Sequence, residues 1–421
     1  MKKNKFKSQP SQILEGSHAI ALAIKNIRPA VVSAYPITPQ THIVEDLAKF
    51  KADGEADFKY VRAESEFTAA SIVAGASATG ARVYSATSSQ GLLLMTEVIF
   101  NIAGMRLPVV ITCANRGVSA PITIWNDQQD AITIRDTGWI MLFAENHQEA
   151  VDQHIMAYKL AENLKLPVMV NIDGFTLTHT YEPVFIPDRK QIKKYLPDYQ
   201  PAKGQYLDAA NPVTLGSFAQ PSYYMEIRQD LHNDLMSALD LVNKEYEKYH
   251  KQIRHPEQSE GSRGSKTQPD SSPSARLGVR MTIENNGLLE YYGHKHPKII
   301  LIAMGSVVGT IKDAVDEIND KIGFPNAVGV LKIKCFRPFP SAAVLQILKN
   351  CKYAGVIDKS ISLGSIGPLA LDVKTAAQGN IKTIIRSFIV GLGGRDVTKN
   401  IIKKIIKKIK SVGDGANFIG N

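Results

Sequence analysis

The chain has 421 residues, of which 44% are hydrophobic and 21% are charged, a composition typical of a globular protein with two or three domains. No run approaches the roughly 18 uninterrupted apolar residues that a membrane span needs, and the basic start MKKNKFKSQP has no apolar segment behind it. We therefore expect a cytoplasmic protein without a membrane partner. The net charge of +10 comes from dispersed lysines and arginines, which does not favour nucleic-acid binding.

The three cysteines, Cys113, Cys335 and Cys351, show no CxxC or other metal-ligand spacing. Their low, odd number also argues against a disulfide framework. We expect this chain to carry neither a metal site nor an iron–sulfur cluster of its own.

The chain is expected to begin with a basic extension at residues 1–16 and to continue as a first domain at residues 17–250. In this domain short apolar runs alternate with helix-like segments, as a parallel α/β sheet requires. The runs are residues 30–34, 83–86, 109–113 and 168–172, and the helical segments include residues 64–79, 148–163 and the connecting helix 231–251. The small side chains of residues 67–78 predict a helix packed deep in the interior.

The motif YPITPQT directly follows the first apolar run. Pro36 and Pro39 restrict the backbone and keep Ile37 and Thr38 out of a helix, so the loop should present Thr38 at the end of a strand. Open α/β sheets bind their ligands at this position. The simpler alternative is a strand-to-helix turn in which Thr41 caps the next helix.

The motif RAESEFTAA places Glu64 and Glu66 at the start of a helix rich in small residues. A carboxyl group at this position, followed by apolar residues, is expected to lose part of its hydration and to be available for a buried hydrogen bond. The alternative for Glu66 is an ordinary acidic residue in a first helical turn, where the helix dipole favours it.

Three further polar segments lie at predicted strand ends. TSSQGLLLM is a turn that enters an apolar helix, and Ser88 is placed to cap that helix. NRGVSAP puts Arg116 directly after a strand, where a guanidinium group can bind a carboxylate, although a lone arginine is more often part of a surface ion pair. WNDQQDAITIRDTGW, residues 125–139, is either part of a site or a polar loop anchored by its two tryptophans.

The stretch 251–279 is rich in Ser, Pro, Gly and charged residues and predicts a disordered linker or insertion. Residues 280–421 then repeat the strand–helix alternation and predict a second, smaller α/β domain. The glycines of its GLGGRD motif miss the GxGxxG spacing and predict a turn at a strand end. Residues 401–410 predict an amphipathic helix that packs its isoleucines on this domain and leaves its lysines in solvent.

These motifs occur in one order, together with DGF at residues 173–175 and RPFP at residues 337–340. With them the chain resembles the alpha subunit of the 2-oxoacid:ferredoxin oxidoreductase family, most closely the pyruvate:ferredoxin oxidoreductases (pyruvate synthases). The resemblance covers nearly the whole chain apart from the basic extension and the insertion at 255–278. It implies a parallel-sheet domain that binds the pyrimidine half of thiamine diphosphate, followed by a smaller α/β domain similar to the transketolase C-terminal domain.

The resemblance also implies roles for individual residues. Glu66 would be catalytic, with its carboxyl group hydrogen-bonded to the pyrimidine ring nitrogen of thiamine diphosphate. Thr38 and Arg116 would bind the substrate, Thr38 by donating to a 2-oxo or carboxylate oxygen and Arg116 by neutralising the carboxylate. Further contacts to the cofactor are implied at Pro36, Ile37, Ser89, Gln90 and Gly91.

The remaining parts of such an enzyme are expected on other chains. VGDGAN at residues 412–417 is similar to the opening of a diphosphate and Mg²⁺ motif, but the asparagine pair that this motif needs does not follow. The resemblance therefore implies a beta subunit that supplies the diphosphate and Mg²⁺ site, with gamma and delta subunits beside it. It also implies coenzyme A as co-substrate, iron–sulfur clusters in the partner subunits only, and ferredoxin as electron acceptor.

The implied reaction is the reversible oxidative decarboxylation of pyruvate with coenzyme A to acetyl-CoA and CO₂. One alternative keeps this chemistry with 2-oxoisovalerate or 2-oxoglutarate as substrate, since one or two methylene groups change binding by only about 1–3 kcal/mol. A second alternative is a non-catalytic scaffold subunit, for which Thr38, Glu66 and Arg116 would be unnecessary. A nucleotide-binding dehydrogenase is a third, but it requires a GxGxxG after the first strand, which is absent.

Overall fold

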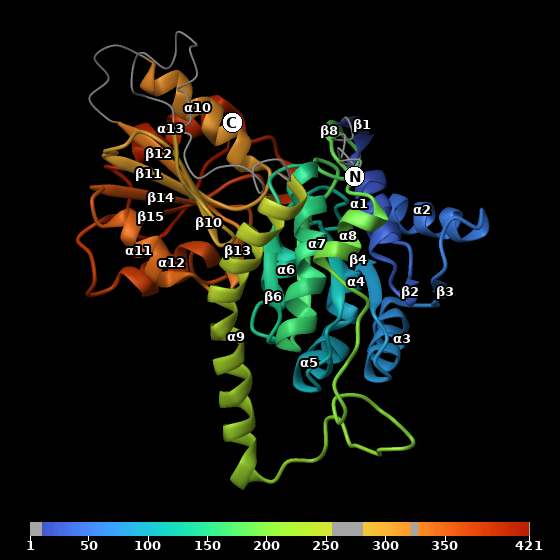
Figure 1. The fold of residues 1–421 in the computed structure, drawn as a ribbon. Coiled ribbons are helices and arrows are strands. Elements are labelled where there is room, and N and C mark those ends of the chain that lie inside the picture. Colours follow the sequence, from blue (N-terminus) through green and yellow to red (C-terminus); the bar gives the residue numbers. More distant parts are fainter. Residues whose placement is uncertain (1–10, 255–280, 321–326, 421) are drawn as a thin grey trace, which may run out of the picture.

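The computed structural model describes residues 11–254, 281–320 and 327–420. They form two α/β lobes, each built around a seven-stranded sheet. Figure 1 shows the first lobe in blue to green and the second in orange to red, with helix α9 (Pro221–Tyr249) at the boundary between them. Residues 1–10 of the predicted basic extension and residues 255–279 of the predicted linker at 251–279 lie outside the described residues. Residues 251–254 of that predicted linker are helical, because they continue α9 as a π-helical turn.

The first sheet has the strand order β13-β6-β7-β5-β4-β2-β3. All its strands except β13 are parallel and belong to the first half of the chain. They are β2 (Val31–Ala34), β3 (Lys59–Arg62), β4 (Val83–Thr87), β5 (Val110–Asn115), β6 (Ile140–Phe143) and β7 (Val168–Asp173). The predicted parallel α/β sheet is confirmed, and its four central apolar runs form strands because both faces of the sheet are covered.

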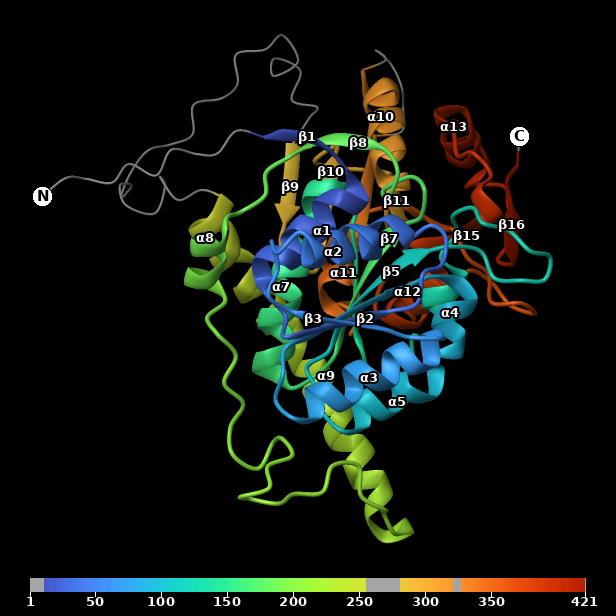
Figure 2. The ribbon, with the colours of Figure 1, turned by 90° about the vertical axis from the view of Figure 1, so that its right-hand side faces the viewer.

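Helices lie on both faces of this sheet, as Figure 2 shows from the side of β3. They are α1 (Gly16–Ile27), α2 (Thr41–Ala52), α3 (Glu66–Ala78), α4 (Ser89–Leu94), α5 (Thr96–Gly104), α6 (Gln129–Thr133), α7 (His147–Leu164) and α8 (Arg189–Tyr195). The prediction that residues 67–78 are packed deep inside is wrong for one face of α3. Ala70, Val73 and Ala74 are buried, whereas Phe67, Ser71 and Gly75 form an exposed stripe with a four-residue spacing.

The helix starts after β2 and β3 are set by local contacts. Helix α2 begins at Thr41 with Gln40 at the N-cap position, so the alternative in which Thr41 is the cap is wrong. Helix α3 is capped by Ser65, whose hydroxyl accepts a hydrogen bond from the Thr68 backbone N–H. This cap makes Glu66 the first residue of the helix.

The second sheet has the order β16-β15-β14-β11-β12-β10-β9. Its strands are β9 (Met281–Asn285), β10 (Leu289–Gly293), β11 (Ile299–Ala303), β12 (Val328–Ile333), β14 (Tyr353–Asp358), β15 (Ile384–Ile389) and β16 (Ala416–Phe418). Its helices are α10 (Val307–Asn319), α11 (Ser341–Leu348), α12 (Pro368–Ala377) and α13 (Lys399–Lys408). As predicted, α13 buries Ile401, Ile402, Ile405 and Ile406 in the core of the second lobe.

Two short strands connect parts of the chain that are far apart in sequence. Strand β13 (Cys335–Arg337) directly follows β12 but pairs antiparallel with β6, so a segment of the second half completes the first sheet. Strand β1 (Gln12–Glu15), inside the predicted extension, pairs antiparallel with β8 (Tyr181–Val184). Figure 2 shows this ribbon above α1.

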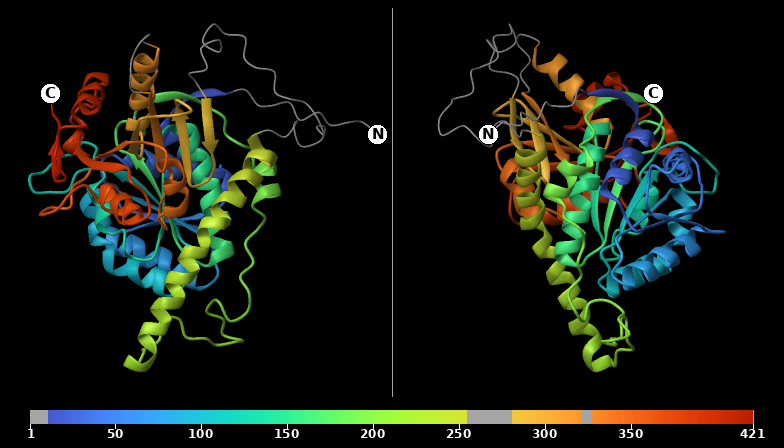
Figure 3. Two further views of the ribbon diagram at one scale, coloured as in Figure 1. Left: turned by 90° about the vertical axis from the view of Figure 1, so that its left-hand side faces the viewer. Right: turned by 45° about the vertical axis from the view of Figure 1, so that its right-hand side comes forward.

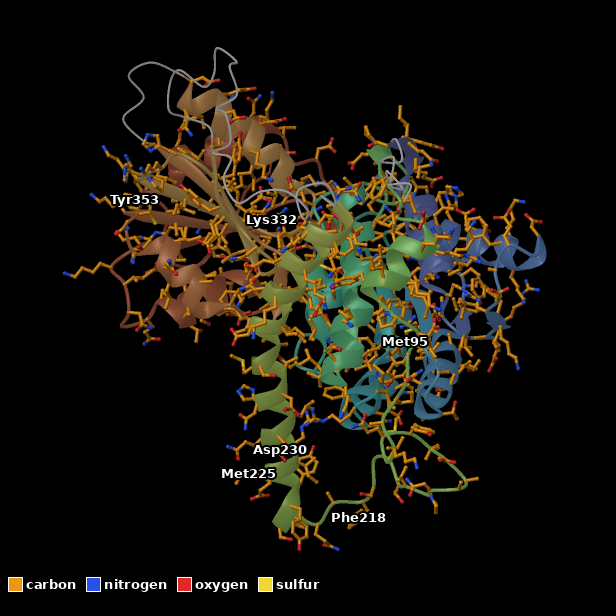
Figure 4. All side chains as sticks on the ribbon, viewed as in Figure 1. Met95, Phe218, Met225, Asp230, Lys332 and Tyr353 are labelled. Carbon is orange, nitrogen blue, oxygen red and sulfur yellow. The ribbon has the colours of Figure 1, made fainter. Side chains whose placement is uncertain are left out.

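Helix α9 extends beyond both lobes as an arm, which Figure 3 shows from two sides. Figure 4 labels Phe218 and Met225 at its free end, where they are 87% and 70% exposed. At the other end the chain continues as a π-helical turn at His250–Arg254. Within the described ranges, no helix combines the length and apolarity needed to cross a bilayer.

A buried cluster of ion pairs joins the lobes where Figure 4 labels Lys332. Lys332 Nζ lies 2.6 Å from Glu145 Oε2 and 3.1 Å from Glu149 Oε1, both in the first lobe, and 2.8 Å from Glu290 Oε2 in the second. Burial by itself lowers the pKa of Lys332, but the three neighbouring carboxylates raise it above its ordinary value. Lys332 therefore forms buried ion pairs with carboxylates of both lobes.

Candidate active site

The residues singled out in the sequence gather at the carboxyl ends of the parallel strands of the first sheet. The loop with Thr38 follows β2, the start of α4 follows β4, and Arg116 follows β5. Asp173 ends β7, and Glu66 begins the helix after β3. This edge is where parallel α/β sheets bind ligands, because the loops after neighbouring strands converge there.

Thr38 and Arg116, predicted separately, are in direct contact. Arg116 Nη1 donates to the Thr38 carbonyl oxygen at 2.9 Å, and Arg116 Nε donates to the Thr123 carbonyl oxygen at 2.7 Å. Arg116 is only 7% exposed, and burial lowers the pKa of its guanidinium group. The Thr38 side chain is exposed, in a loop where Pro36 is also exposed and Ile37 is half-buried.

Glu66 is 7% exposed, and its carboxylate has no hydrogen-bond partner among the described residues. It lies against Gly91 in the first turn of α4. A β-carbon at Gly91 would be 2.6 Å from Glu66 Oε1 and 2.6 Å from Thr87 Oγ1, which is too close for a carbon atom. Gly91 therefore provides the space in which the Glu66 carboxylate lies.

Unpaired polar atoms lie on the residues that lead into α4 and on its first turn. Thr87 Oγ1, Ser88 Oγ and Gln90 Nε2 are buried without hydrogen-bond partners. Ser88 occupies the predicted N-cap position of α4 but its side chain makes no capping bond. Buried polar groups without partners are costly unless a ligand completes them. A carboxylate with donors and acceptors beside it fits the aminopyrimidine ring implied by the resemblance, which offers ring nitrogens and an amino group.

Asp130 organises the loops after β4 and β5, a role that the sequence did not reveal. Its buried carboxylate accepts from the backbone N–H groups of Ser89 at 2.9 Å and Arg116 at 3.0 Å, and from Asn115 Nδ2 at 3.0 Å. Burial raises the pKa of Asp130 to about 6, against the effect of these hydrogen bonds. Ser89 Oγ in turn donates to the Gly117 carbonyl oxygen at 2.6 Å.

The WNDQQD segment connects the first lobe to the second. Asp127 Oδ2 accepts from the Gly393 N–H at 3.0 Å, in the GLGGRD turn, and the Gln128 N–H donates to the Lys359 carbonyl oxygen at 2.8 Å. GLGGRD follows β15 with positive φ at Gly391, Gly393 and Gly394, which confirms the predicted strand-end turn. The row of polar residues is therefore an interdomain joint.

Asp173 is the centre of this joint. It accepts from Ser306 Oγ at 2.5 Å and from Gln128 Nε2 at 3.1 Å, and it forms an ion pair with Lys359 Nζ at 3.3 Å. Burial opposes its charge, but Lys359 and Ser306 lower the pKa of Asp173 below its ordinary value. Ser306 follows β11 and Lys359 follows β14, so the carboxyl ends of both sheets face one another here.

Large apolar side chains are exposed around this edge of the first sheet. They come from the loop after β2, the start of α3, α4, the loop after β5 and the loop after β14. They are Tyr35 (40% exposed), Phe67 (38%), Leu94 (51%), Ile122 (79%), Ile124 (41%), Trp125 (53%) and Leu363 (89%). Apolar surface gathered around a polar site is typical of a surface that another protein covers.

Comparison with protein families matches residues 22–248 to the family described as pyruvate flavodoxin/ferredoxin oxidoreductase, thiamine diphosphate-binding. Residues 297–402 match pyruvate:ferredoxin oxidoreductase core domain II. Among named relatives, the chain is 42% identical over 409 residues to pyruvate synthase subunit PorA of Methanosarcina barkeri, covering 95% of this chain and 92% of that protein. It is 37% identical over 405 residues to ketoisovalerate oxidoreductase subunit VorA of Pyrococcus horikoshii, covering 95% and 94%.

The fold is similar to that of a solved 2-oxoglutarate:ferredoxin oxidoreductase from Magnetococcus marinus, a structure with 2-oxoglutarate, coenzyme A and succinyl-CoA bound. The TM-score is 0.69 at 19% identity, over 95% of this chain and 66% of that chain. The likeness supports the two-lobe α/β fold.

Proposed function

The chain belongs to the pyruvate:ferredoxin oxidoreductase family, and from this premise we propose that it is the alpha subunit of a thiamine-diphosphate-dependent pyruvate:ferredoxin oxidoreductase. The enzyme oxidatively decarboxylates pyruvate with coenzyme A to acetyl-CoA and CO₂ and passes the electrons to ferredoxin, in a reversible reaction. The observation that carries this proposal is the buried Glu66 carboxylate without a partner beside Gly91, in the matched thiamine diphosphate-binding domain.

Glu66 is the proposed catalytic residue. Its carboxyl group would bind a pyrimidine ring nitrogen and hold a proton there, which a buried acid next to unpaired polar atoms is suited to do. When bound, thiamine diphosphate supplies the carbon nucleophile for the 2-oxo carbon and accepts the electron pair left by CO₂. Ser89, Gln90 and Gly91 would shape one side of this pocket, and the loop with Pro36 and Ile37 another.

Arg116 and Thr38 are the proposed substrate contacts. Two N–H groups of Arg116 already bind backbone carbonyl oxygens, which fixes the guanidinium plane and leaves its remaining N–H groups for a carboxylate. The exposed Thr38 hydroxyl, in the loop to which Arg116 is bound, is placed to donate to a second oxygen of the 2-oxo acid. Arg116 would neutralise the substrate carboxylate until CO₂ departs.

We propose that a beta subunit binds over this site and completes it. The exposed apolar side chains of the loops and helix starts described above, from Tyr35 to Leu363, support a large protein partner, which would keep water from Glu66 and the substrate. That subunit would supply the diphosphate and Mg²⁺ site, and gamma and delta subunits would complete the complex. Iron–sulfur clusters in these partners would carry electrons to ferredoxin. The three buried free thiols fit a reducing, cytoplasmic location.

We propose pyruvate as the substrate rather than 2-oxoisovalerate or 2-oxoglutarate. The identity to a pyruvate synthase subunit, 42%, exceeds the 37% to a ketoisovalerate oxidoreductase subunit over a similar length. A 2-oxoisovalerate or 2-oxoglutarate enzyme remains the alternative within the same chemistry. The scaffold alternative is disfavoured, because a scaffold gains nothing from a buried, unpaired Glu66.

The test is an anaerobic assay of the co-expressed complex with pyruvate, 2-oxoisovalerate and 2-oxoglutarate, measuring coenzyme A-dependent reduction of a viologen dye. We expect pyruvate to give the highest kcat/KM and Glu66→Ala to lower it by at least about 10²-fold. The matched control is Glu64→Ala, since Glu64 is exposed, precedes helix α3 and accepts a hydrogen bond from Thr68 Oγ1 at 2.8 Å. A Glu66→Ala complex of normal activity would refute the site, and a different preferred acid would change only the substrate.

A further inference from the structure

Glu15, His42 and His179 form a cluster at the outer side of the first lobe. They are far apart in sequence: Glu15 ends β1, His42 is the second residue of α2, and His179 follows the turn after β7. Each offers one metal-ligand atom, and these atoms all lie within 4.8 Å of one another. Two imidazoles and one carboxylate are the donor set of many zinc and non-haem iron sites.

The geometry of the cluster is fixed by further contacts. Glu15 Oε1 lies 2.7 Å from His42 Nδ1, and the rings of His42 and His179 lie 4.5 Å apart. His179 Nδ1 lies 2.6 Å from Thr178 Oγ1, a fully buried hydroxyl that also accepts from the Phe175 N–H at 2.8 Å. A hydrogen bond on one ring nitrogen commonly orients a metal-binding histidine and leaves its other nitrogen for the cation.

The cluster lies in a part of the first lobe that is rich in histidines. Glu15 is a common negative neighbour of His18, His147 and His179. Of the ten histidines in the chain, four therefore lie around this one carboxylate.

We propose that Glu15, His42 and His179 bind one divalent transition-metal cation of the Zn²⁺ class, with water completing its coordination. Nitrogen ligands favour such cations over Mg²⁺ and Ca²⁺, which take oxygen ligands. The cysteine spacing led us to expect no metal site in this chain, but cysteines have no part in this one.

The cation would join the segment that carries Thr38, one of the proposed substrate contacts, to the turn after β7. His42 lies four residues after Thr38, at the start of α2. His179 stacks on Phe175 at 4.7 Å, and a β-carbon on the adjacent Gly174 would lie 2.6 Å from Pro39 Cγ. A metal between His42 and His179 therefore ties the loop after β2 to the turn after β7, and its role is to hold the Thr38 loop in place.

The test is metal binding to the full-length chain, purified without a histidine tag and stripped with a chelator. Zn²⁺ affinity is measured by competition with a chromophoric chelator, and Co²⁺ is used to report coordination by its visible absorption. We expect one Zn²⁺ per chain, a Co²⁺ spectrum with nitrogen ligands, and no competition by Mg²⁺. His179→Ala and His42→Ala should each weaken Zn²⁺ binding by at least about tenfold, and Glu15→Gln by less.

The matched control is His232→Ala, an exposed histidine on the α9 arm, which should leave Zn²⁺ binding unchanged. Thermal unfolding provides a second measurement, since Zn²⁺ should raise the Tm of the wild type and of His232→Ala but not of the His42→Ala/His179→Ala double variant. Unchanged Zn²⁺ affinity in that folded double variant, or no binding by the wild type, would overturn the proposal. Neither measurement needs enzymatic activity, so the outcome is independent of the proposed function.

Discussion

Arg116 shows how a single residue is prepared for a ligand by its backbone contacts. Its backbone N–H binds Asp130, and its side chain binds the carbonyl oxygens of Thr38 and Thr123. These contacts lower the mobility of a long side chain before substrate arrives, so less conformational entropy is lost on binding. The same bonds hold the exposed Thr38 loop against the strand that carries Arg116.

Arg116→Lys tests this arrangement while keeping the positive charge. A lysine ammonium group cannot bind two backbone carbonyl oxygens and a carboxylate in one plane. We expect the KM for pyruvate to rise by at least about tenfold, corresponding to about 1.4 kcal/mol of lost binding, with little change in Tm. The measurement is steady-state kinetics of the complex, with Arg62→Lys, an exposed residue of β3, as control. Equal KM values for both variants would contradict substrate binding by Arg116.

The positions of Thr38, Glu66 and Arg116 in loops and at a helix start were predictable, because proline restriction, helix starts and strand ends are local signals. The sequence did not reveal the bond between Arg116 and the Thr38 carbonyl, since that contact depends on how neighbouring strands are ordered. Asp130 was missed for a related reason. In WNDQQD it is one polar residue among several, and only the tertiary fold shows that its carboxylate is buried among backbone N–H groups.

At the scale of elements, the short helix α4 controls the space around Glu66. The chain turns from β4 into α4 through Ser88 and Ser89, and Ser89 has a φ of 47°. The first turn of the helix then brings Gly91 against the Glu66 carboxylate at the start of α3. The starts of α3 and α4, which follow β3 and β4, thus face each other, and only a residue without a side chain fits between them.

Gly91→Ala should therefore impair the site specifically. The added methyl group would displace Glu66 or Thr87, and we expect kcat to fall by at least about 10²-fold, a loss comparable to misplacing a catalytic group by 1 Å. Thiamine diphosphate affinity, measured by calorimetry on the complex, should fall as well.

The matched control is Gly75→Ala in α3, where a β-carbon would meet nothing within 4 Å. This change should keep activity and stabilise the chain by about 0.5–1 kcal/mol, because alanine favours the helix. Denaturant unfolding of the isolated chain measures it. Full activity in Gly91→Ala would show that Glu66 has more room than the structure indicates.

The periodic elements were predictable, because strands buried on both faces and helices with one apolar side leave clear patterns. The elements that the patterns did not reveal are short. Strands β1, β13 and β16 have three or four residues each, and α6 has five, too few for a period to be visible. The sequence also indicated burial of residues 67–78 on all sides, because small residues do not distinguish an exposed face from a buried one.

On the scale of the whole molecule, charged and polar groups rather than apolar ones join the lobes next to the site. Asp173 of the first lobe receives hydrogen bonds from Ser306 and an ion pair from Lys359, both of the second. These groups are buried, so each depends on its partner to offset lost hydration. The joint therefore sets the distance between the carboxyl ends of the two sheets.

Lys359→Met should weaken this joint. It leaves the Asp173 carboxylate buried without its cation, and we expect a loss of about 3–5 kcal/mol in unfolding free energy. Urea unfolding followed by tryptophan fluorescence measures this, since Trp125 lies beside Gly394 in the joint. Lys399→Met is the control, because Lys399 forms an exposed pair with Glu317, and we expect little change there. Similar stability of the two variants would argue against a tightly coupled joint.

Strand β13 has a consequence for how the protein is made. On the ribosome, residues up to 254 emerge before Cys335–Arg337. Until β13 has been synthesised, β6 is therefore an unpaired edge strand of the first sheet. Only when about eighty further residues have been synthesised does the missing strand arrive. A nascent chain stalled in between carries an unpaired edge that invites pairing with other chains, and a gene cut at the lobe boundary would encode a first half that lacks one of its own strands.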